Sequence, residues 1–400
     1  MRTLGPIITL LAIHFLAAGA VHANSFDRTF EFDEIIAFGE SSTDTGNVAQ
    51  AQCSDGQPGA GFPVFWAPCT PFDRNTYMPG YFDGRLSNGP LWVEFLADAL
   101  GVERPRPSAD SGTNYAHAGA KIGPDATTEP GAEEVNLRVN LYPGNPAMLI
   151  SEECRPGYSV GDVYLYGAGE PVCGSEVPHI NTQIGRYRED RGGFNNKQLV
   201  VIWGGANDLR DIGRDPAGPE AAIANIVSNL ATAVSTAATG GAKHIAVLNQ
   251  LNAARAPITQ ALCGGAPSPS TCLGEIEAAV QGFNAALRTT LKELQLGLRE
   301  QGYRTRIHYV DVYSAGEVAV ELSELFGKPF ANTTDAALVP NPADAPFSSP
   351  IPDNAEDYLF WDVIHPTEKA YRITAYRVCK TLDRRIRGFK PRCSKILTSN

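Results

Sequence analysis

The sequence lacks the positive charge that a nucleic-acid-binding protein needs. Its 33 lysines and arginines are outnumbered by 44 aspartates and glutamates, which gives a formal net charge of -11 and a pI of about 5.2. No basic stripe is present, so nucleic acid is not expected as a partner. An acidic surface mainly favours solubility and carries little information about a substrate.

The chain also lacks internal repeats, low-complexity linkers and metal-binding motifs. Without a linker, residues 24–400 are expected to form a single domain, and the hydrophobic content of 43% is enough for a large core. No CxxC or Cys–His spacing supports a zinc site, so no metal is predicted. After the N-terminus, no stretch is long and apolar enough to predict a stable membrane span. The oligomeric state is left open.

The N-terminus carries the pattern of a secretory leader. Met1-Arg2 precedes an apolar stretch from Leu4 to Ala20, and Val21-His22-Ala23 offers small residues at both key positions of a cleavage site. We predict a signal peptide over residues 1–23 and a secreted protein, extracellular or periplasmic. A membrane anchor is the alternative, but the run is short and contains Pro6 and His14.

The eight cysteines fit an exported chain, which meets oxidising conditions. They fall into neighbouring pairs: Cys53 with Cys69, Cys154 with Cys173, Cys263 with Cys272, and Cys379 with Cys393. Each pair brackets a segment rich in glycine and proline that a disulfide would order. Eight cysteines allow 105 pairings in all. We predict the four local ones.

Strand-like and helical patterns alternate along the chain. The expected strands are Glu34–Phe38, Gln198–Trp203, His244–Leu248 and Arg306–Val312, and the expected helices are Leu91–Leu100, Glu220–Ala238, Leu273–Glu300 and Pro366–Leu382. This alternation predicts an α/β protein with a parallel sheet covered on both faces. Two segments, Gly123–Pro178 and Lys328–Glu356, are rich in glycine and proline and are expected to be long irregular loops or insertions.

Residues suited to acyl transfer follow or flank these elements. Ser41 follows the first strand, and His365 precedes the last helix with Asp362 three residues before it. Active sites of parallel α/β sheets gather at the carboxyl ends of the strands. A serine hydroxyl needs a base to become a nucleophile, histidine titrates in the useful range, and an aspartate orients the imidazole.

The reaction also needs donors for the oxyanion of its tetrahedral intermediate. The backbone N–H of Ser41, that of a glycine such as Gly119, and the side-chain amide of Asn207 are the candidates. Glycine suits such a place because its backbone approaches a ligand closely and adopts unusual angles.

Four blocks in order resemble the SGNH/GDSL hydrolases, which are secreted or periplasmic esterases and lipases. The blocks are Gly39–Asn47 (GESSTDTGN), Asn114–Ala120 (NYAHAGA), Gly205–Asp208 (GAND) and Asp362–Thr367 (DVIHPT). The resemblance covers about residues 34–382. It implies a flavodoxin-like three-layer α/β/α sandwich with a mostly parallel sheet, here with loop insertions. It also implies oxyanion donors at Gly119 and Asn207.

The first block departs from the family pattern at two positions. Glu40 stands where the family usually has aspartate, and Thr43 where it usually has serine. Glutamate keeps the carboxylate and adds a methylene, which changes the contacts that support the turn. Because Ser41 and His365 remain, we interpret the chain as an active variant.

The sequence therefore predicts a secreted serine esterase or lipase that needs no metal or organic cofactor. Its substrate would be a small-molecule, lipid or acylated-carbohydrate ester. Acyl transfer to another alcohol, with the same triad, is one alternative. A secreted binding protein without catalytic activity is the other, and Glu40 is the only residue that favours it.

Several other polar or aromatic residues are interpreted as structural. His117 is too close to Gly119 to be a second base, and Asp44 and Asp208 are expected to be structural hydrogen bonders. The aromatic residues between Phe62 and Phe82 could line a substrate cleft. Packing around a disulfide is favoured for most of them.

Overall fold

A parallel sheet forms the centre of the fold. The computed structural model describes residues 30–49, 80–123, 135–137, 176–210, 212, 217–338 and 351–398. The sheet has four strands in the order β1-β4-β5-β6, and each neighbouring pair is parallel. The strands are β1 (Glu34–Gly39), β4 (Gln198–Trp203), β5 (His244–Leu248) and β6 (Arg306–Val310).

A short extended segment, residues 113–117, adds to the sheet beside β1. The N–H of Ala37 donates to Thr113 O (3.0 Å), and the N–H of Tyr115 donates to Ala37 O (2.8 Å). Asn114 forms a parallel bridge with Ala37. The order is then this segment, β1, β4, β5 and β6, which is the flavodoxin-like order 2-1-3-4-5 when counted along the chain. The expected fold class is confirmed.

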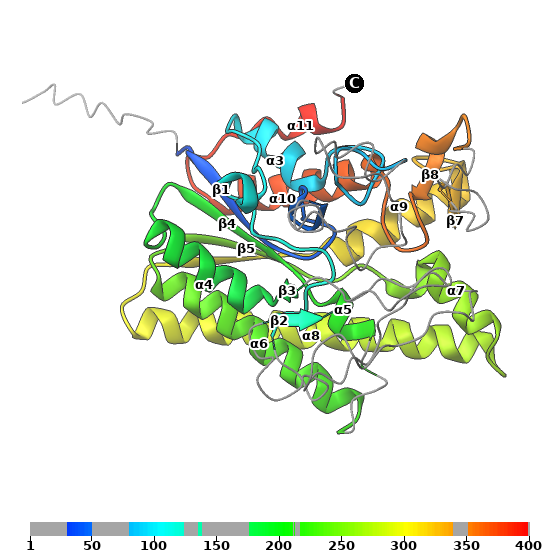
Figure 1. Cartoon of the computed structure of the whole chain (residues 1–400), viewed down its shortest axis with the longest axis horizontal. Helices are drawn as coiled ribbons and strands as arrows, with labels where there is room; N and C mark the ends of the chain where they lie inside the picture. Colours follow the sequence, from blue (N-terminus) through cyan, green and yellow to red (C-terminus); the bar gives the residue numbers. More distant parts are fainter. Residues whose placement is uncertain are drawn as a thin grey trace, which may run out of the picture.

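Helices cover both faces of the sheet (Figure 1). In β1, Ile35 and Ala37 face one core while Ile36 and Phe38 face the other, as the alternation of side chains along a strand requires. One layer contains α3 (Trp92–Leu100), α10 (Glu368–Arg385) and α11 (Cys393–Ile396), and the other α4 (Ile180–Arg191), α6 (Pro219–Thr239) and α8 (Pro269–Glu300).

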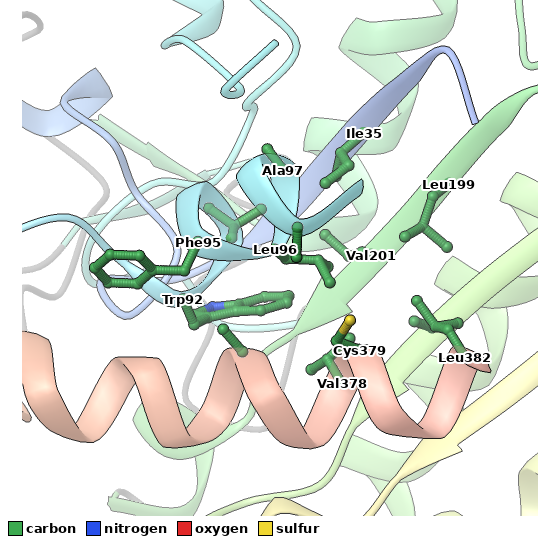
Figure 2. Close-up of a cluster of buried hydrophobic side chains, with 14 of the residues drawn as sticks. Ile35, Trp92, Phe95, Leu96, Ala97, Leu199, Val201, Val378, Cys379 and Leu382 are labelled. Carbon is green, nitrogen blue, oxygen red and sulfur yellow. The ribbon is translucent and has the colours of Figure 1, made fainter. Parts of the chain in front are cut away.

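The first of these cores holds the helix that follows His365. Figure 2 shows Trp92 and Leu96 of α3 lying between the sheet and Val378 of α10. Trp92 also meets Trp203 of β4 edge to face, with ring centroids 5.8 Å apart. Each large side chain buried in this way contributes about 1.5–3 kcal/mol. The start of α10, and the loop before it, are therefore fixed against the sheet.

Further helices, turns and short strands connect these elements. They are α5 (Ala206–Arg210), α7 (Pro257–Gly264), α9 (Val312–Phe326) and the 3-10 turns Ser108–Asp110, Ala253–Arg255 and Ala355–Asp357. Strands β2 (Val135–Leu137) and β3 (Glu176–Pro178) pair antiparallel, and β7 (Asn332–Ala336) and β8 (Tyr358–Phe360) are joined in parallel. The two segments expected to be irregular throughout therefore contain strand residues, which corrects that expectation.

The expected boundaries agree closely with the structure, apart from one strand. Gln198–Trp203 and His244–Leu248 are confirmed as strands, and the four expected helices are present with small shifts. The strand expected to continue to Val312 ends at Val310 instead. The reason is Asp311, whose carboxylate accepts the N–H of Ser314 and begins helix α9.

Two of the four expected disulfides lie in the described part of the chain and are confirmed. Cys263 bonds to Cys272, and Cys379 bonds to Cys393, each with Cα atoms 5.6 Å apart. The pairs Cys53/Cys69 and Cys154/Cys173 lie outside the described residues. So do the leader over residues 1–23 and most of the aromatic stretch before Tyr81.

Helix α6 contradicts the expectation that no stretch after the N-terminus is long and apolar enough to span a membrane. Within the described ranges, α6 is the one helix long and apolar enough to cross a membrane by length and composition. A helix in the core of a folded domain meets the same criteria. Ile226, Leu230 and Val234 of α6 are buried in the core beneath the sheet, so this helix is explained by packing.

Candidate active site

The predicted site residues lie at one edge of the sheet because the elements before them are neighbours. Ser41 follows β1, Gly119 follows the edge segment 113–117, and Asn207 lies in α5 directly after β4. These three extended segments are adjacent in the sheet, and parallel strands end at the same edge. The structure thus places the predicted serine and both predicted oxyanion residues on one side of the fold.

The turn that carries Ser41 is closely packed against its neighbours. A Cβ atom at Gly39 would lie 2.5 Å from Trp203 O, so only glycine lets β1 end so near β4. Gln183 of α4 clamps the same residue: Gly39 N–H donates to its Oε1 (3.0 Å), and its Nε2 donates to Gly39 O (2.9 Å). The strand end is therefore rigid, and Ser41 beyond it is partly buried.

Asp44 connects this turn to the segment of Gly119. Its carboxylate accepts the backbone N–H groups of Gly46 (2.8 Å), Asn47 (2.6 Å) and Val48 (3.0 Å), and also that of Ala118 (2.9 Å). It therefore caps the turn behind the serine and holds the residue before Gly119. The expected structural role of Asp44 is confirmed.

Gly119 has the backbone geometry expected of an amide donor to a ligand. Its φ is 83°, in the left-handed region that favours glycine. In the described part of the chain, neither the N–H of Gly119 nor that of Ser41 donates to a protein acceptor. Both amides are thus free for a ligand at this edge of the sheet.

Glu40 contacts the predicted amide donor Asn207, a role that sequence reasoning missed. The carboxylate of Glu40 accepts the backbone N–H groups of Ala206 (3.1 Å) and Asn207 (3.2 Å) at the start of α5. It also accepts a hydrogen bond from Asn207 Nδ2, and the same nitrogen donates to Ala120 O at 3.1 Å. Both acceptors face the nitrogen end of the amide, so they fix which end of Asn207 points toward them.

Asp362 and His365 form the pair that the sequence predicts. Asp362 Oδ2 lies 2.7 Å from His365 Nδ1, and its Oδ1 accepts the backbone N–H groups of Ile364 (2.8 Å) and His365 (2.7 Å). Burial alone would raise the pKa of Asp362, but the charge and hydrogen bonds of His365 and the N–H of Ile364 lower it. The carboxylate is therefore ionised and orients the imidazole.

The loop of His365 connects β8 to α10 and is held at several points. Trp361 N–H donates to His365 O (2.7 Å), and the N–H of Ile258 in α7 donates to Val363 O (2.9 Å). Ser87 Oγ donates to Pro366 O (2.9 Å). One contact within the loop and two from distant parts of the chain thus hold the loop in place.

Tyr371 of α10 connects this loop to the serine turn. Its side chain is fully buried, and burial raises the pKa of its hydroxyl. The nearby hydroxyl of Ser42 lowers that pKa, while the charges of Asp362 and Glu40 raise it. The Tyr371 hydroxyl therefore lies close to both halves of the candidate site.

Ser41 and His365 are not joined by a hydrogen bond in the described part of this structure. Considering the described residues, no hydrogen bond joins Ser41 Oγ to the ring of His365. Such contacts are often long in the absence of substrate and tighten when it binds. The structure thus shows a buried Asp362–His365 pair, with Ser41 at the same end of the sheet.

The other histidines and acids have structural surroundings. Burial lowers the pKa of His117, whose Nδ1 lies 3.1 Å from Ala118 O, so it is a neutral core residue. Asp208 accepts the N–H of Ile122. His244 and His308 form a buried pair at β5 and β6 that sequence reasoning missed, with Nδ1 of His244 3.1 Å from Nε2 of His308.

The family model and the sequence comparisons agree on one family. The family model for GDSL-like Lipase/Acylhydrolase matches residues 35–378. A GDSL esterase/lipase of Arabidopsis thaliana is 24% identical over 366 residues, covering 86% of this chain and 78% of that protein. The GDSL esterase/lipase EXL4 of the same plant is 22% identical, covering 94% and 96%. A solved member of the lipolytic protein G-D-S-L family from Veillonella parvula DSM 2008 aligns with a TM-score of 0.35 and 13% identity, over 88% of this chain and 98% of that chain.

Proposed function

The chain belongs to the GDSL-like lipase/acylhydrolase family, and on this premise we propose that it hydrolyses esters with a Ser41–His365–Asp362 triad after export from the cell. Family membership makes it a carboxylic ester hydrolase. The assignment of the individual residues, the acyl-enzyme mechanism and the export are our proposal.

In the proposed reaction, Ser41 Oγ attacks the carbonyl carbon of the ester while His365 Nε2 takes the hydroxyl proton. The same proton then passes to the oxygen of the leaving alcohol, and the acyl group remains on Ser41. Water, activated by His365, releases the acid and restores the serine. Asp362 stays ionised and stabilises the imidazolium in both halves of the reaction.

The observation that carries this proposal is the 2.7 Å contact between Asp362 Oδ2 and His365 Nδ1. A carboxylate oxygen only accepts hydrogen bonds, so the proton of the neutral imidazole lies on Nδ1. Nε2 is then unprotonated and able to act as the base. An orienting aspartate and a base in this tautomer are what general-base activation of a serine requires.

The oxyanion would be stabilised by the N–H groups of Ser41 and Gly119 and by Asn207 Nδ2. The first two are free of protein acceptors within the described residues. Asn207 Nδ2 has to give up one of its present acceptors to bind the oxyanion. The oxyanion would replace the neutral carbonyl of Ala120, which now accepts from Nδ2 at 3.1 Å. A charged acceptor forms a stronger hydrogen bond than a neutral one, so this exchange is favourable.

Export and domain organisation complete the proposal. The leader pattern over residues 1–23 and the disulfides Cys263–Cys272 and Cys379–Cys393 support passage into an oxidising compartment. We propose that residues 24–400 fold as one domain. The N–H of Phe30 donates to Gly388 O (2.9 Å), which joins the first described residues to the C-terminal segment and supports this organisation.

Hydrolysis of p-nitrophenyl esters from acetate to palmitate by the oxidised protein tests the proposed function. We expect Ser41→Ala to abolish turnover and Asp362→Asn to lower kcat by about 10⁴-fold, because the amide favours the wrong tautomer of His365. Both variants should keep the circular dichroism spectrum of the parent. Undiminished hydrolysis by Ser41→Ala would refute the assignment of the nucleophile.

A further inference from the structure

The carboxylate of Asp362 has a fourth hydrogen-bond donor that lies far from it in the sequence. Tyr81 Oη donates to Asp362 Oδ2 at 2.8 Å, and this is the same oxygen that faces His365 Nδ1 at 2.7 Å. The other oxygen is occupied by the N–H groups of Ile364 and His365. We infer that Tyr81 is a positioning residue of the triad, an inference that rests on the proposed function.

The surroundings of Tyr81 hold its hydroxyl in this place. The side chain is 6% exposed and belongs to a small core whose members include Val48, Ala118 and Trp361. Val48 follows the serine turn, Ala118 precedes Gly119, and Trp361 precedes Asp362. The ring of Tyr81 therefore packs among residues next to the serine turn, Gly119 and Asp362, and this packing restricts the position of its hydroxyl.

A second donor on Oδ2 changes how strongly that oxygen attracts His365. Hydrogen bonds to a carboxylate stabilise its charge and spread it over more donors. With Tyr81 in place, less of the charge of Oδ2 is available to stabilise the imidazolium. Without the tyrosine hydroxyl, Oδ2 should hold the protonated imidazole more strongly but less rigidly.

The charged and titratable neighbours of Asp362 are few in the described part of the chain. His365 faces it from its own loop, Tyr81 from the segment before α3, and Tyr371 from α10. Glu40 acts on the same Tyr371 hydroxyl from the serine turn. Of the two tyrosines, Tyr81 is the one whose hydroxyl donates to Asp362, and Tyr81→Phe removes that donor while the buried ring is kept.

Tyr81→Phe tests this inference because it deletes the hydroxyl and preserves the packing of the ring. We expect the acid limb of the pH profile of kcat/KM to move to higher pH by about one unit. At the pH optimum, kcat should fall by no more than about 10-fold, because Asp362 keeps its other three donors.

Tyr115→Phe is the matched control. Tyr115 is also 6% exposed, and its hydroxyl also donates to a carboxylate at 2.8 Å, that of Asp190 near the end of α4. That end of the helix lies by the start of β4, where Tyr187 contacts Gln198, and thus at the opposite edge of the sheet. The control should lose stability as Tyr81→Phe does but keep the pH profile of the parent.

If Tyr81→Phe and Tyr115→Phe have the same pH profile, the inference about Tyr81 is wrong. The proposed function is not affected by that result. A parent protein without Ser41-dependent hydrolysis would instead overturn the proposed function. The role of Tyr81 is then decided by ¹H–¹⁵N NMR titration of the His365 ring, assigned with His365→Gln. Titration of His365 at higher pH in Tyr81→Phe than in the parent would support it, and an unchanged titration would reject it.

Discussion

Glu40→Gln separates a catalytic contribution of Glu40 from a purely structural one. The carboxylate is 3% exposed and accepts N–H groups from Ala206, from the backbone of Asn207 and from the amide of Asn207. A glutamine has one accepting and one donating end, so at least one of these buried donors loses its acceptor. An unpaired buried donor costs about 1–3 kcal/mol, and the remaining bonds are weaker with a neutral acceptor. We expect the free energy of unfolding to fall by about 2–4 kcal/mol.

The effect on catalysis follows from the orientation of Asn207. In the parent, Glu40 and the carbonyl of Ala120 accept only, so they hold the nitrogen end of the Asn207 amide in place. A glutamine at position 40 can also donate, and the amide can then turn its oxygen toward the site. Loss of one oxyanion donor lowers kcat by about 10²–10³-fold. Partial loss of the correct orientation should therefore lower kcat by about 10–100-fold, with KM little changed.

The assay compares kcat, KM and urea unfolding for Glu40→Gln, Asn207→Ala and a control, Asp311→Asn. Asp311 also accepts N–H donors at the start of a helix, from Ser314, so its variant makes the same carboxylate-to-amide change outside the site. The control should lose stability and keep kcat. If Glu40→Gln keeps kcat within about twofold while Asn207→Ala loses 10²-fold or more, Glu40 is only a helix cap and the reasoning is wrong.

Two further predictions concern stability. Burial lowers the pKa of His244 to about 4 and that of His308 to about 3. Below pH 6.5 these histidines therefore bind protons in the unfolded chain but not in the folded one. For each of them, the free energy of unfolding should fall by about 1.4 kcal/mol per pH unit as the pH drops from 6.5 to the pKa of the folded state. Urea unfolding at pH 7 and 5 checks this, and an equal acid loss in His244→Phe/His308→Leu would contradict it. The disulfide Cys379–Cys393 closes a separation of 14 residues, so Cys379→Ala/Cys393→Ala should lower the free energy of unfolding by about 3 kcal/mol. The parent and the variant should converge once a reductant is added.

Local patterns predicted the central sheet well, because buried parallel strands are continuous apolar runs. Gln198–Trp203 is buried at every position, and its boundaries match those of β4. Helix α4 was missed for the opposite reason. Its sequence INTQIGRYREDR is mostly polar, and only Ile180, Gln183, Ile184 and Tyr187 are buried. Strand β7 (NTTDA) has no buried apolar alternation that would distinguish it from a loop.

The site was predictable to the extent that its residues lie close together in the sequence. Asp362 and His365 are three positions apart, and their contact follows from one short motif. The contacts of Tyr81 with Asp362 and of Glu40 with Asn207 span 281 and 167 residues. No spacing within a motif contains that information, because the fold decides which distant segments meet.

The acidic residues of the motifs supply hydrogen-bond acceptors for backbone N–H groups of the site. Backbone N–H groups are the same at every position, so a sequence can direct them only through the acceptors that it places nearby. Asp44 collects such groups from the serine turn and from Ala118, Asp362 collects them from its own loop, and Glu40 collects them from α5. Each carboxylate is buried, and each fixes a different loop of the site. The motifs thus fix the positions of three loops through three buried carboxylates. The extra methylene of Glu40 is tolerated because the start of α5 supplies N–H donors within its reach.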